Sequence, residues 1–157
     1  MEQIKVEIVE PNHPDLQLLI SKLDSELSKK YPPEAIFTID FEKPNISETI
    51  FSIAYYDHIP VGCGAIRPLE KKVLELKRFY VDPSYRNKGI ASKLLNFLEG
   101  KAKELQYEVI KLETGVKQSE AISLYKRHGY NEIEAFGEYI YSKSSLCFEK
   151  KLKKTGD

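Results

Sequence analysis

The stretch LELKRFYVDPSYRNKGIAS, residues 74–92, predicts a strand, a tight turn and the first turns of a helix. Leu74, Leu76 and Tyr80 alternate with other residues in the period of two that is typical of a strand. The Asp-Pro-Ser sequence that follows favours a turn because proline fixes φ at its second position. Apolar residues then recur at intervals of three and four, which predicts a helix with one apolar face that begins near Gly89.

Residues 86–91, RNKGIA, join the predicted strand to the predicted helix. Gly89 permits close approach to the backbone, and the N–H groups of the first helical turn have no partner inside the helix. Partial positive charge collects at this end of the helix, and Arg86 and Lys88 add full charges. The segment therefore predicts a phosphate site, and a pyrophosphate suits it best.

The composition of the 157 residues is 41% hydrophobic and 31% charged, which is typical of one globular domain over residues 1–157. The 24 Lys and Arg residues balance the 24 Asp and Glu residues. Without a net charge, no global field attracts nucleic acid or an anionic membrane. We therefore expect neither as a partner, and any anion site must be local.

No segment has the pattern of a signal peptide or the roughly 20 apolar residues of a membrane span, which favours a cytoplasmic location. Cys63 and Cys147 lie in apolar, strand-like runs, so we expect reduced thiols that pack in the core. His13, His58 and His128 are scattered without the spacing of metal ligands, so no metal site is expected.

The rest of the chain predicts a mixed α/β order. Strands are expected over 4–9, 49–56, 60–69, 73–81, 108–113, 130–134 and 145–152, and the two other helices over 14–30 and 119–128. Ser119 suits the N-cap of the last helix, and Gly129 suits its C-terminal end. Residues 31–48 are irregular and contain three prolines. They are either a connector over one edge of the core or a lid over a binding site.

Two motifs resemble those of the GNAT superfamily of acetyl-CoA-dependent N-acetyltransferases. RNKGIA at 86–91 is similar to the family's Arg/Gln-x-x-Gly-x-Gly/Ala phosphate motif. QSEAISLY at 118–125, followed by Gly129-Tyr130, is similar to its closing helix and strand. The resemblance implies an α/β fold with a central mixed, mostly antiparallel sheet of six to seven strands, flanked by helices on both faces. It also implies acetyl transfer from acetyl-CoA to a primary amine.

The resemblance further implies how acetyl-CoA is held. The pantetheine arm would pair with residues 79–81, where the central strand splays away from the LETG strand, and the Val81 N–H would face the thioester oxygen. Arg127 would reach the adenosine phosphate, or it is a plain surface cation near a helix C-terminus. The implied cofactor contacts are Phe79, Tyr80, Val81, Arg86, Asn87, Lys88, Gly89, Ile90, Ala91, Ser92, Gln118 and Arg127.

Two side chains are implied to be catalytic. Tyr125 matches the family tyrosine that donates its phenol proton to the leaving sulfur, and an ordinary pKa of about 10 keeps it neutral. The alternative is a tyrosine that only packs on the sheet. Glu75 lies on the central strand where some members carry the base, which acts directly or through water. The alternative is a strand glutamate paired with Lys77 or Arg67.

The acceptor, a small-molecule or peptide amine, is expected between residues 31–41, the hairpin at Arg67 and the aromatic loop 136–141. Arg67 either anchors an acceptor carboxylate or pairs with Glu70 at the surface. The candidate acceptor contacts are Tyr31, Glu34, Arg67, Phe136 and Tyr139. The alternative function is a non-catalytic acyl-CoA-binding module. The protein is expected to be a monomer or a homodimer.

Overall fold

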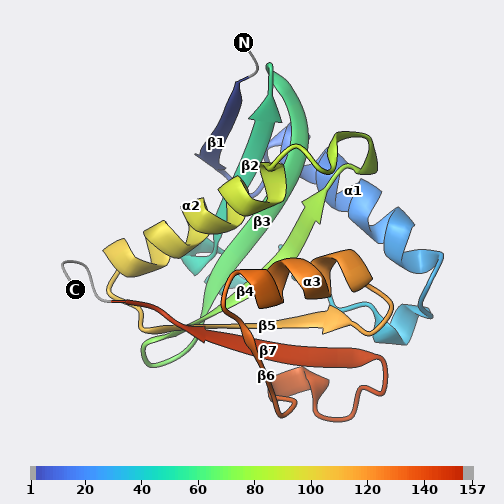
Figure 1. Cartoon of the computed structure of the whole chain (residues 1–157), viewed down its shortest axis with the longest axis vertical. Coiled ribbons are helices and arrows are strands. Elements are labelled where there is room, and N and C mark those ends of the chain that lie inside the picture. The colour runs from blue at the N-terminus through green and yellow to red at the C-terminus, as the bar shows by residue number, and fades with distance from the viewer. Residues whose placement is uncertain (1–2, 154–157) are drawn as a thin grey trace.

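The computed structural model describes residues 3–153 (Figure 1). The strands are β1 (Ile4–Val9), β2 (Ile50–Tyr56), β3 (Ile59–Glu70), β4 (Val73–Val81), β5 (Val109–Gly115), β6 (Asn131–Ile133) and β7 (Ser145–Lys151). The helices are α1 (Pro14–Ser28), α2 (Ile90–Glu104) and α3 (Ser119–Arg127), with short 3-10 turns at Pro33–Ala35, Pro44–Glu48, Pro83–Tyr85 and Gly137–Tyr139. Within the described residues, no helix combines the length and the apolar character needed to cross a membrane.

One seven-stranded sheet contains all the strands, in the order β1-β2-β3-β4-β5-β7-β6. β4 and β5 run parallel, and each of the other neighbouring pairs is antiparallel. α2 and α3 cover one face, where Leu98 and Leu124 share a buried cluster with Leu76 of β4 (Figure 1). α1 covers the other face, where Leu19 packs with Ile53 of β2. The predicted sheet and its helices on both faces are confirmed.

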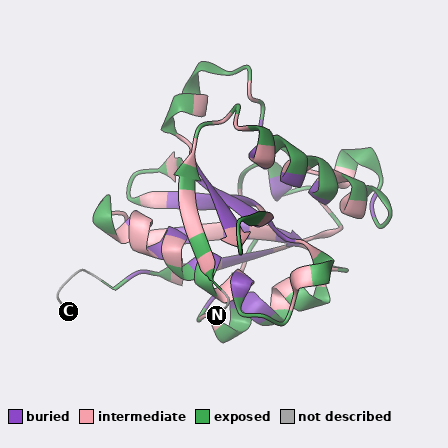
Figure 2. Cartoon of the chain, turned by 90° about the horizontal axis from the view of Figure 1, so that it is seen from above, coloured by how far each residue is buried: buried purple, intermediate pink, exposed green. Residues whose placement is uncertain are grey.

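The core lies between the sheet and its helices, as the buried strands and the exposed outer faces of the helices show (Figure 2). Cys63 on β3 and Cys147 on β7 are buried, free thiols. Their expected place in the core is therefore confirmed.

Arg78 interrupts the regular alternation of β4. Its φ is +55°, and the pairing of β3 with β4 shifts register between Cys63 and Ala65. Leu76 therefore packs on the α2 side of the sheet, whereas Tyr80 packs with α1. The prediction that Tyr80 shares a face with the leucines of this strand is wrong, because the extra residue of a bulge reverses the faces taken by the side chains beyond it.

β4 and β5 pair along only part of their length. Residues 73–76 of β4 face residues 109–112 of β5. Beyond that point β4 stays paired with β3, while β5 stays paired with β7. Residues 77–81 and 113–115 therefore have no ladder between them, which is the splay that the resemblance implied.

The start of α3 differs from the prediction. Ser119 is the first helical residue, and Gln118 is the N-cap without a side-chain capping bond. The Gln118 N–H donates to the Gly115 carbonyl at 3.0 Å, and this turn begins the helix one residue early. Ser119 as the N-cap was therefore wrong. Gly129 has φ +90°, and its predicted role at the C-terminal end of α3 is confirmed.

Candidate active site

Residues 86–92 form the turn that leads from β4 into α2. Asp82 accepts a hydrogen bond from the Ser84 N–H at 2.9 Å, which fixes the turn before it. Asn87 and Gly89 have φ of +65° and +80°, and Gly89 is the N-cap of α2 without a capping side chain. The first N–H groups of α2 are therefore left for a ligand, as in other anion sites at helix N-termini.

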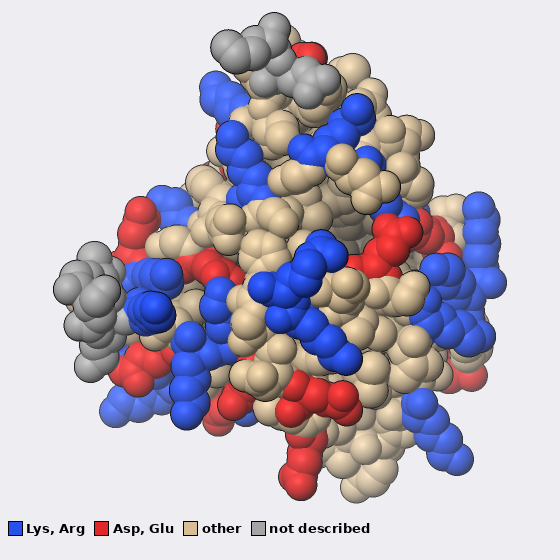
Figure 3. Space-filling model, viewed as in Figure 1, with Lys and Arg blue, Asp and Glu red and all other residues tan. Residues whose placement is uncertain are grey.

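A cavity of about 540 Å³, called here the cofactor cavity, opens at this end of α2 between α1 and α3. Every expected cofactor residue except Lys88 lines it. The Lys88 Nζ instead lies 5.5 Å from the centre of the Tyr56 ring. Four cations and two carboxylates line the cavity: Lys30, Arg86, Lys117, Arg127, Glu26 and Glu120. Figure 3 shows basic side chains over α3, so the cavity favours an anionic ligand.

The Arg86 guanidinium already has protein partners. Its Nη2 lies 2.9 Å from Glu26 Oε1 on α1, and its Nε donates to the Val81 carbonyl at 3.0 Å. Its Nη1 lies 3.8 Å from the exposed Glu120 carboxylate. A diphosphate at this site therefore meets an arginine that is partly neutralised.

A second cavity of about 100 Å³, called here the acceptor cavity, lies between the unpaired ends of β4 and β5. It is lined by Lys77, Arg78 and Phe79 of β4 and by residues 113–115 of β5. The two cavities share four lining residues: Leu23, Phe79, Gln118 and Ala121. They therefore adjoin across the splay of the sheet.

Tyr125 of α3 lines the acceptor cavity and is only 4% exposed. Its ring packs among Phe79, Tyr130 and Phe148. Within residues 3–153 its hydroxyl makes no hydrogen bond. Burial raises the pKa of Tyr125, and the nearby Glu113 carboxylate raises it further. The residue is thus a packed ring that carries a neutral, unengaged phenol.

Glu113, near the end of β5, is the functional candidate that sequence reasoning missed. It lines the acceptor cavity with Tyr125. Among the described residues, its only hydrogen bond comes from the Ser145 hydroxyl at 2.5 Å. Burial raises the pKa of Glu113, against the opposing effects of Ser145 and Lys77. The sequence predicted a strand at LETG, but it could not show that the splay of the sheet brings the glutamate of LETG to a cavity.

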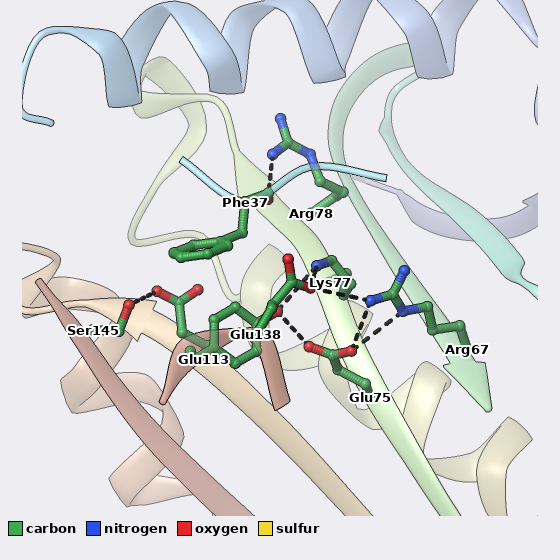
Figure 4. Close-up of polar contacts among 9 residues, drawn as sticks. Phe37, Arg67, Glu75, Lys77, Arg78, Glu113, Glu138 and Ser145 are labelled. Atoms are coloured by element: carbon green, nitrogen blue, oxygen red, sulfur yellow. Dashed lines mark hydrogen bonds and ion pairs between the residues drawn. The ribbon is translucent and has the colours of Figure 1, made fainter. Parts of the chain in front are cut away.

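Glu75, the residue expected to act as a base, is 1% exposed and lines neither cavity. Arg67 Nη2 and Nε donate to Glu75 Oε1 at 3.1 and 3.2 Å (Figure 4). The Tyr139 hydroxyl donates to Glu75 Oε2 at 2.5 Å. Both oxygens of Glu75 are therefore already bonded by neighbouring side chains.

Lys77 and Glu138 extend this buried polar network. Lys77 Nζ donates to the Tyr139 hydroxyl at 3.0 Å. It also lies 3.3 Å from Glu138 Oε2 (Figure 4). Glu138 also lies 3.4 Å from Arg67 Nη2. The proposed pairing of Arg67 with Glu70 is wrong, because Arg67 lies directly opposite Glu75 in the β3–β4 ladder and pairs with Glu75 and Glu138, while Glu70 pairs with Lys111.

Of the other expected acceptor contacts, Tyr31 lines the acceptor cavity, where its hydroxyl accepts from the Lys117 N–H at 2.9 Å. Phe37 lines it as well, and its ring contacts the Tyr139 ring edge-on. Phe136 also makes an edge-on ring contact with Tyr139 and lies outside both cavities. Glu34 is exposed and also lies outside both cavities. Part of the segment 31–41 therefore covers the acceptor cavity.

A family model described as the acetyltransferase (GNAT) family matches residues 16–130. This chain belongs to the GNAT family. It is 36% identical over 138 residues to an IAA acetyltransferase of Azospirillum brasilense, which covers 85% of this chain and 88% of the relative. It is 32% identical over 123 residues to the uncharacterized N-acetyltransferase YsnE of Bacillus subtilis, which covers 77% and 82% of the two chains.

Solved structures of this GNAT fold are also similar. A Klebsiella pneumoniae protein described as an acyl-CoA N-acyltransferase superposes with a TM-score of 0.85 at 32% identity, over 96% of this chain and 99% of that chain. A PaiA N-acetyltransferase from Thermoplasma acidophilum, solved with coenzyme A, shares the fold with a TM-score of 0.72 at 22% identity, over 95% and 99%. The protein is a GNAT N-acetyltransferase, with acetyl-CoA as its co-substrate.

Proposed function

We propose that a primary amine attacks the acetyl carbon of acetyl-CoA directly, at the junction of the cofactor and acceptor cavities. The observation that supports this most is the unengaged hydroxyl of Tyr125 in the acceptor cavity, whose ring packs beside Phe79, a residue that lines both cavities. In the reaction an N–C bond forms, the C–S bond breaks, and coenzyme A leaves as a thiolate. One proton must leave the amine, and one must reach the sulfur.

The residues of the cofactor cavity suit coenzyme A. The N–H groups at residues 87–92 and the surrounding cations suit a diphosphate. Within residues 3–153, the backbone of β4 beyond Leu76 has no ladder partner on the β5 side, so it is free to pair with the pantetheine arm. The Val81 N–H is our candidate donor to the thioester oxygen, which gains negative charge during the attack.

Tyr125 is the proposed acid. Burial keeps its phenol protonated at neutral pH. With no protein partner among residues 3–153, the hydroxyl loses no hydrogen bond when it turns to the sulfur. A positioned acid of this kind contributes roughly 10²- to 10⁴-fold to the rate.

Glu113 is the proposed base, in the role that the sequence suggested for Glu75. Glu113 reaches the acceptor cavity and has one hydrogen bond, whereas both Glu75 oxygens are occupied. A raised pKa makes the Glu113 carboxylate a better proton acceptor than an ordinary glutamate. Glu75 then holds Tyr139 and Arg67 in position, and a proton route through water to Glu75 is the alternative.

Release of free thiol from acetyl-CoA in the presence of a primary amine tests this proposal. The wild-type protein should release thiol only when acetyl-CoA and the amine are both present. Glu113→Gln should lower kcat roughly 10²-fold or more, while Glu75→Gln retains most of the turnover. The reverse order would return the base to Glu75. Coenzyme A binding without thiol release for any amine would favour the non-catalytic module.

A further inference from the structure

The charges around the acceptor cavity do not balance within the network that contains them. Among the described residues, the carboxylates of Glu75, Glu113 and Glu138 interact with the cations of Lys77 and Arg67 (Figure 4). Of these five residues, Lys77 and Glu113 line the cavity itself. Arg67 bonds Glu75 and Glu138, and Lys77 bonds Glu138 and Tyr139. Glu113 is left with the hydroxyl of Ser145 and no ion pair among the described residues.

The other cations near the cavity have partners as well, although the buried Nε of Arg78 makes no hydrogen bond among the described residues. Arg78 pairs with Asp24 and donates to the Phe37 carbonyl at 3.1 Å. Lys117 Nζ donates to the Lys30 carbonyl at 3.2 Å. In the part of the chain that the structure describes, a ligand carboxylate in this cavity would therefore meet paired cations and the unpaired Glu113.

Beside the polar groups of Lys77, Arg78, Glu113 and Gln118, the cavity has an apolar wall. Apolar or aromatic side chains from α1, β4 and the segment 31–41 form it: Leu23, Leu27, Tyr31, Ala35, Ile36, Phe37, Leu76 and Phe79. A cavity of about 100 Å³ has room for a slim carbon chain, and a carboxylate placed against the apolar wall would lose its water without gaining a partner.

We propose that the acceptor is a primary amine on an unbranched apolar carbon chain, with no carboxylate beside the amine. Its ammonium group supplies the positive charge that Glu113 lacks, and its carbon chain contacts the apolar wall. This inference rests on the proposed amine transfer and names its substrate class. An alkylamine and the side chain of a lysine share this chemistry.

Pentylamine, norleucine and norleucinamide test the inference, because they differ only in carrying no group, a carboxylate or a neutral amide beside the amine. Thiol release should give pentylamine a kcat/KM at least about ten-fold above that of norleucine, with norleucinamide between them. Nα-acetyl-lysine amide, assayed beside pentylamine, distinguishes a peptide lysine from a free alkylamine as the source. Norleucine turned over as well as pentylamine would overturn the inference and leave amine acetylation standing. No thiol release with any of the four amines would contradict both the proposed substrate class and amine acetylation itself.

A charge variant separates electrostatics from shape. Glu138→Gln frees one bond from each of Lys77 and Arg67, so the ratio of pentylamine to norleucine kcat/KM should fall several-fold. Glu134→Gln, an exposed glutamate in the same loop with no ion pair among residues 3–153, is the matched control and should leave the ratio unchanged. An unchanged ratio in Glu138→Gln would contradict the charge explanation.

Discussion

Arg86 Nη2 lies 2.9 Å from Glu26 Oε1, and both side chains line the cofactor cavity. The pair joins α1 to the phosphate segment, across the place where the diphosphate is proposed to bind. The Glu26 carboxylate therefore already pairs with Arg86, the arginine of the RNKGIA motif that would otherwise be available to an anion. Binding of coenzyme A has to compete with this contact or accommodate it.

Replacing Glu26 should strengthen coenzyme A binding. Glu26→Gln removes one negative charge from the cavity and frees Arg86, so the Kd should fall roughly two- to five-fold at low ionic strength. Titration calorimetry at low and high salt measures this, and the gain should shrink as salt screens the charges.

Glu120→Gln is the matched control for Glu26→Gln. Its carboxylate is 77% exposed and lies 3.8 Å from Arg86 Nη1, so its removal should change the Kd less. Weaker binding in Glu26→Gln would mean instead that the ion pair holds α1 in its binding position.

Tyr125→Phe should lower kcat roughly 10²-fold with little change in coenzyme A affinity or in the free energy of unfolding. The hydroxyl makes no hydrogen bond within the described residues, so its loss leaves no buried partner unsatisfied. Steady-state thiol release measures the effect on kcat, and a melting curve measures the effect on stability.

Tyr130→Phe is the paired control for Tyr125→Phe, because the two rings are in contact. The Tyr130 hydroxyl donates to the buried Glu99 at 2.9 Å, so this variant should lose about 1–3 kcal/mol of stability. Its kcat at a temperature where it is folded should stay near that of the wild type. Equal losses of kcat in both variants would remove Tyr125 from the chemistry.

The pH profile should report Glu113. Transfer needs its carboxylate form, and burial raises the pKa of this group. The acidic limb of kcat should therefore lie above the ordinary glutamate range, with kcat rising as pH rises through the raised pKa. Glu113→Gln should remove this limb, whereas Glu75→Gln should keep it. A limb that persists in Glu113→Gln would assign it to another group.

Gly115→Ala should disturb the cover of the acceptor cavity. A Cβ at this position would lie 2.1 Å from the Tyr31 hydroxyl, closer than any real contact, so Tyr31 has to move. The bond from the Lys117 N–H to that hydroxyl would be lost. We expect a lower melting temperature and a higher KM for the amine.

Gly100→Ala, inside α2, is the control for Gly115→Ala. Apart from the nearby helix backbone, no atom of the described residues lies within 4 Å of its added Cβ, so the change should add about 0.5–1 kcal/mol of stability through helix propensity. An unchanged amine KM in Gly115→Ala would show that Tyr31 does not bound the acceptor.

Patterns among neighbouring residues predicted much of the fold, and they also predicted the phosphate site at residues 86–91. The turn, Gly89 and the apolar period after it are all contained in one stretch, so the start of α2 followed from neighbouring residues. The bulge at Arg78 did not, because its φ of +55° depends on pairing with β3. Glu113 was missed for the same reason, since its access to a cavity depends on where β4 and β5 part.

We propose that the thioester of acetyl-CoA lies in the splay between β4 and β5, beside Tyr125. A crystal structure with coenzyme A bound tests it most directly. We expect the diphosphate on the N–H groups of residues 87–92 and the sulfur within hydrogen-bonding distance of the Tyr125 hydroxyl. A diphosphate elsewhere, or a sulfur far from Tyr125, would contradict it.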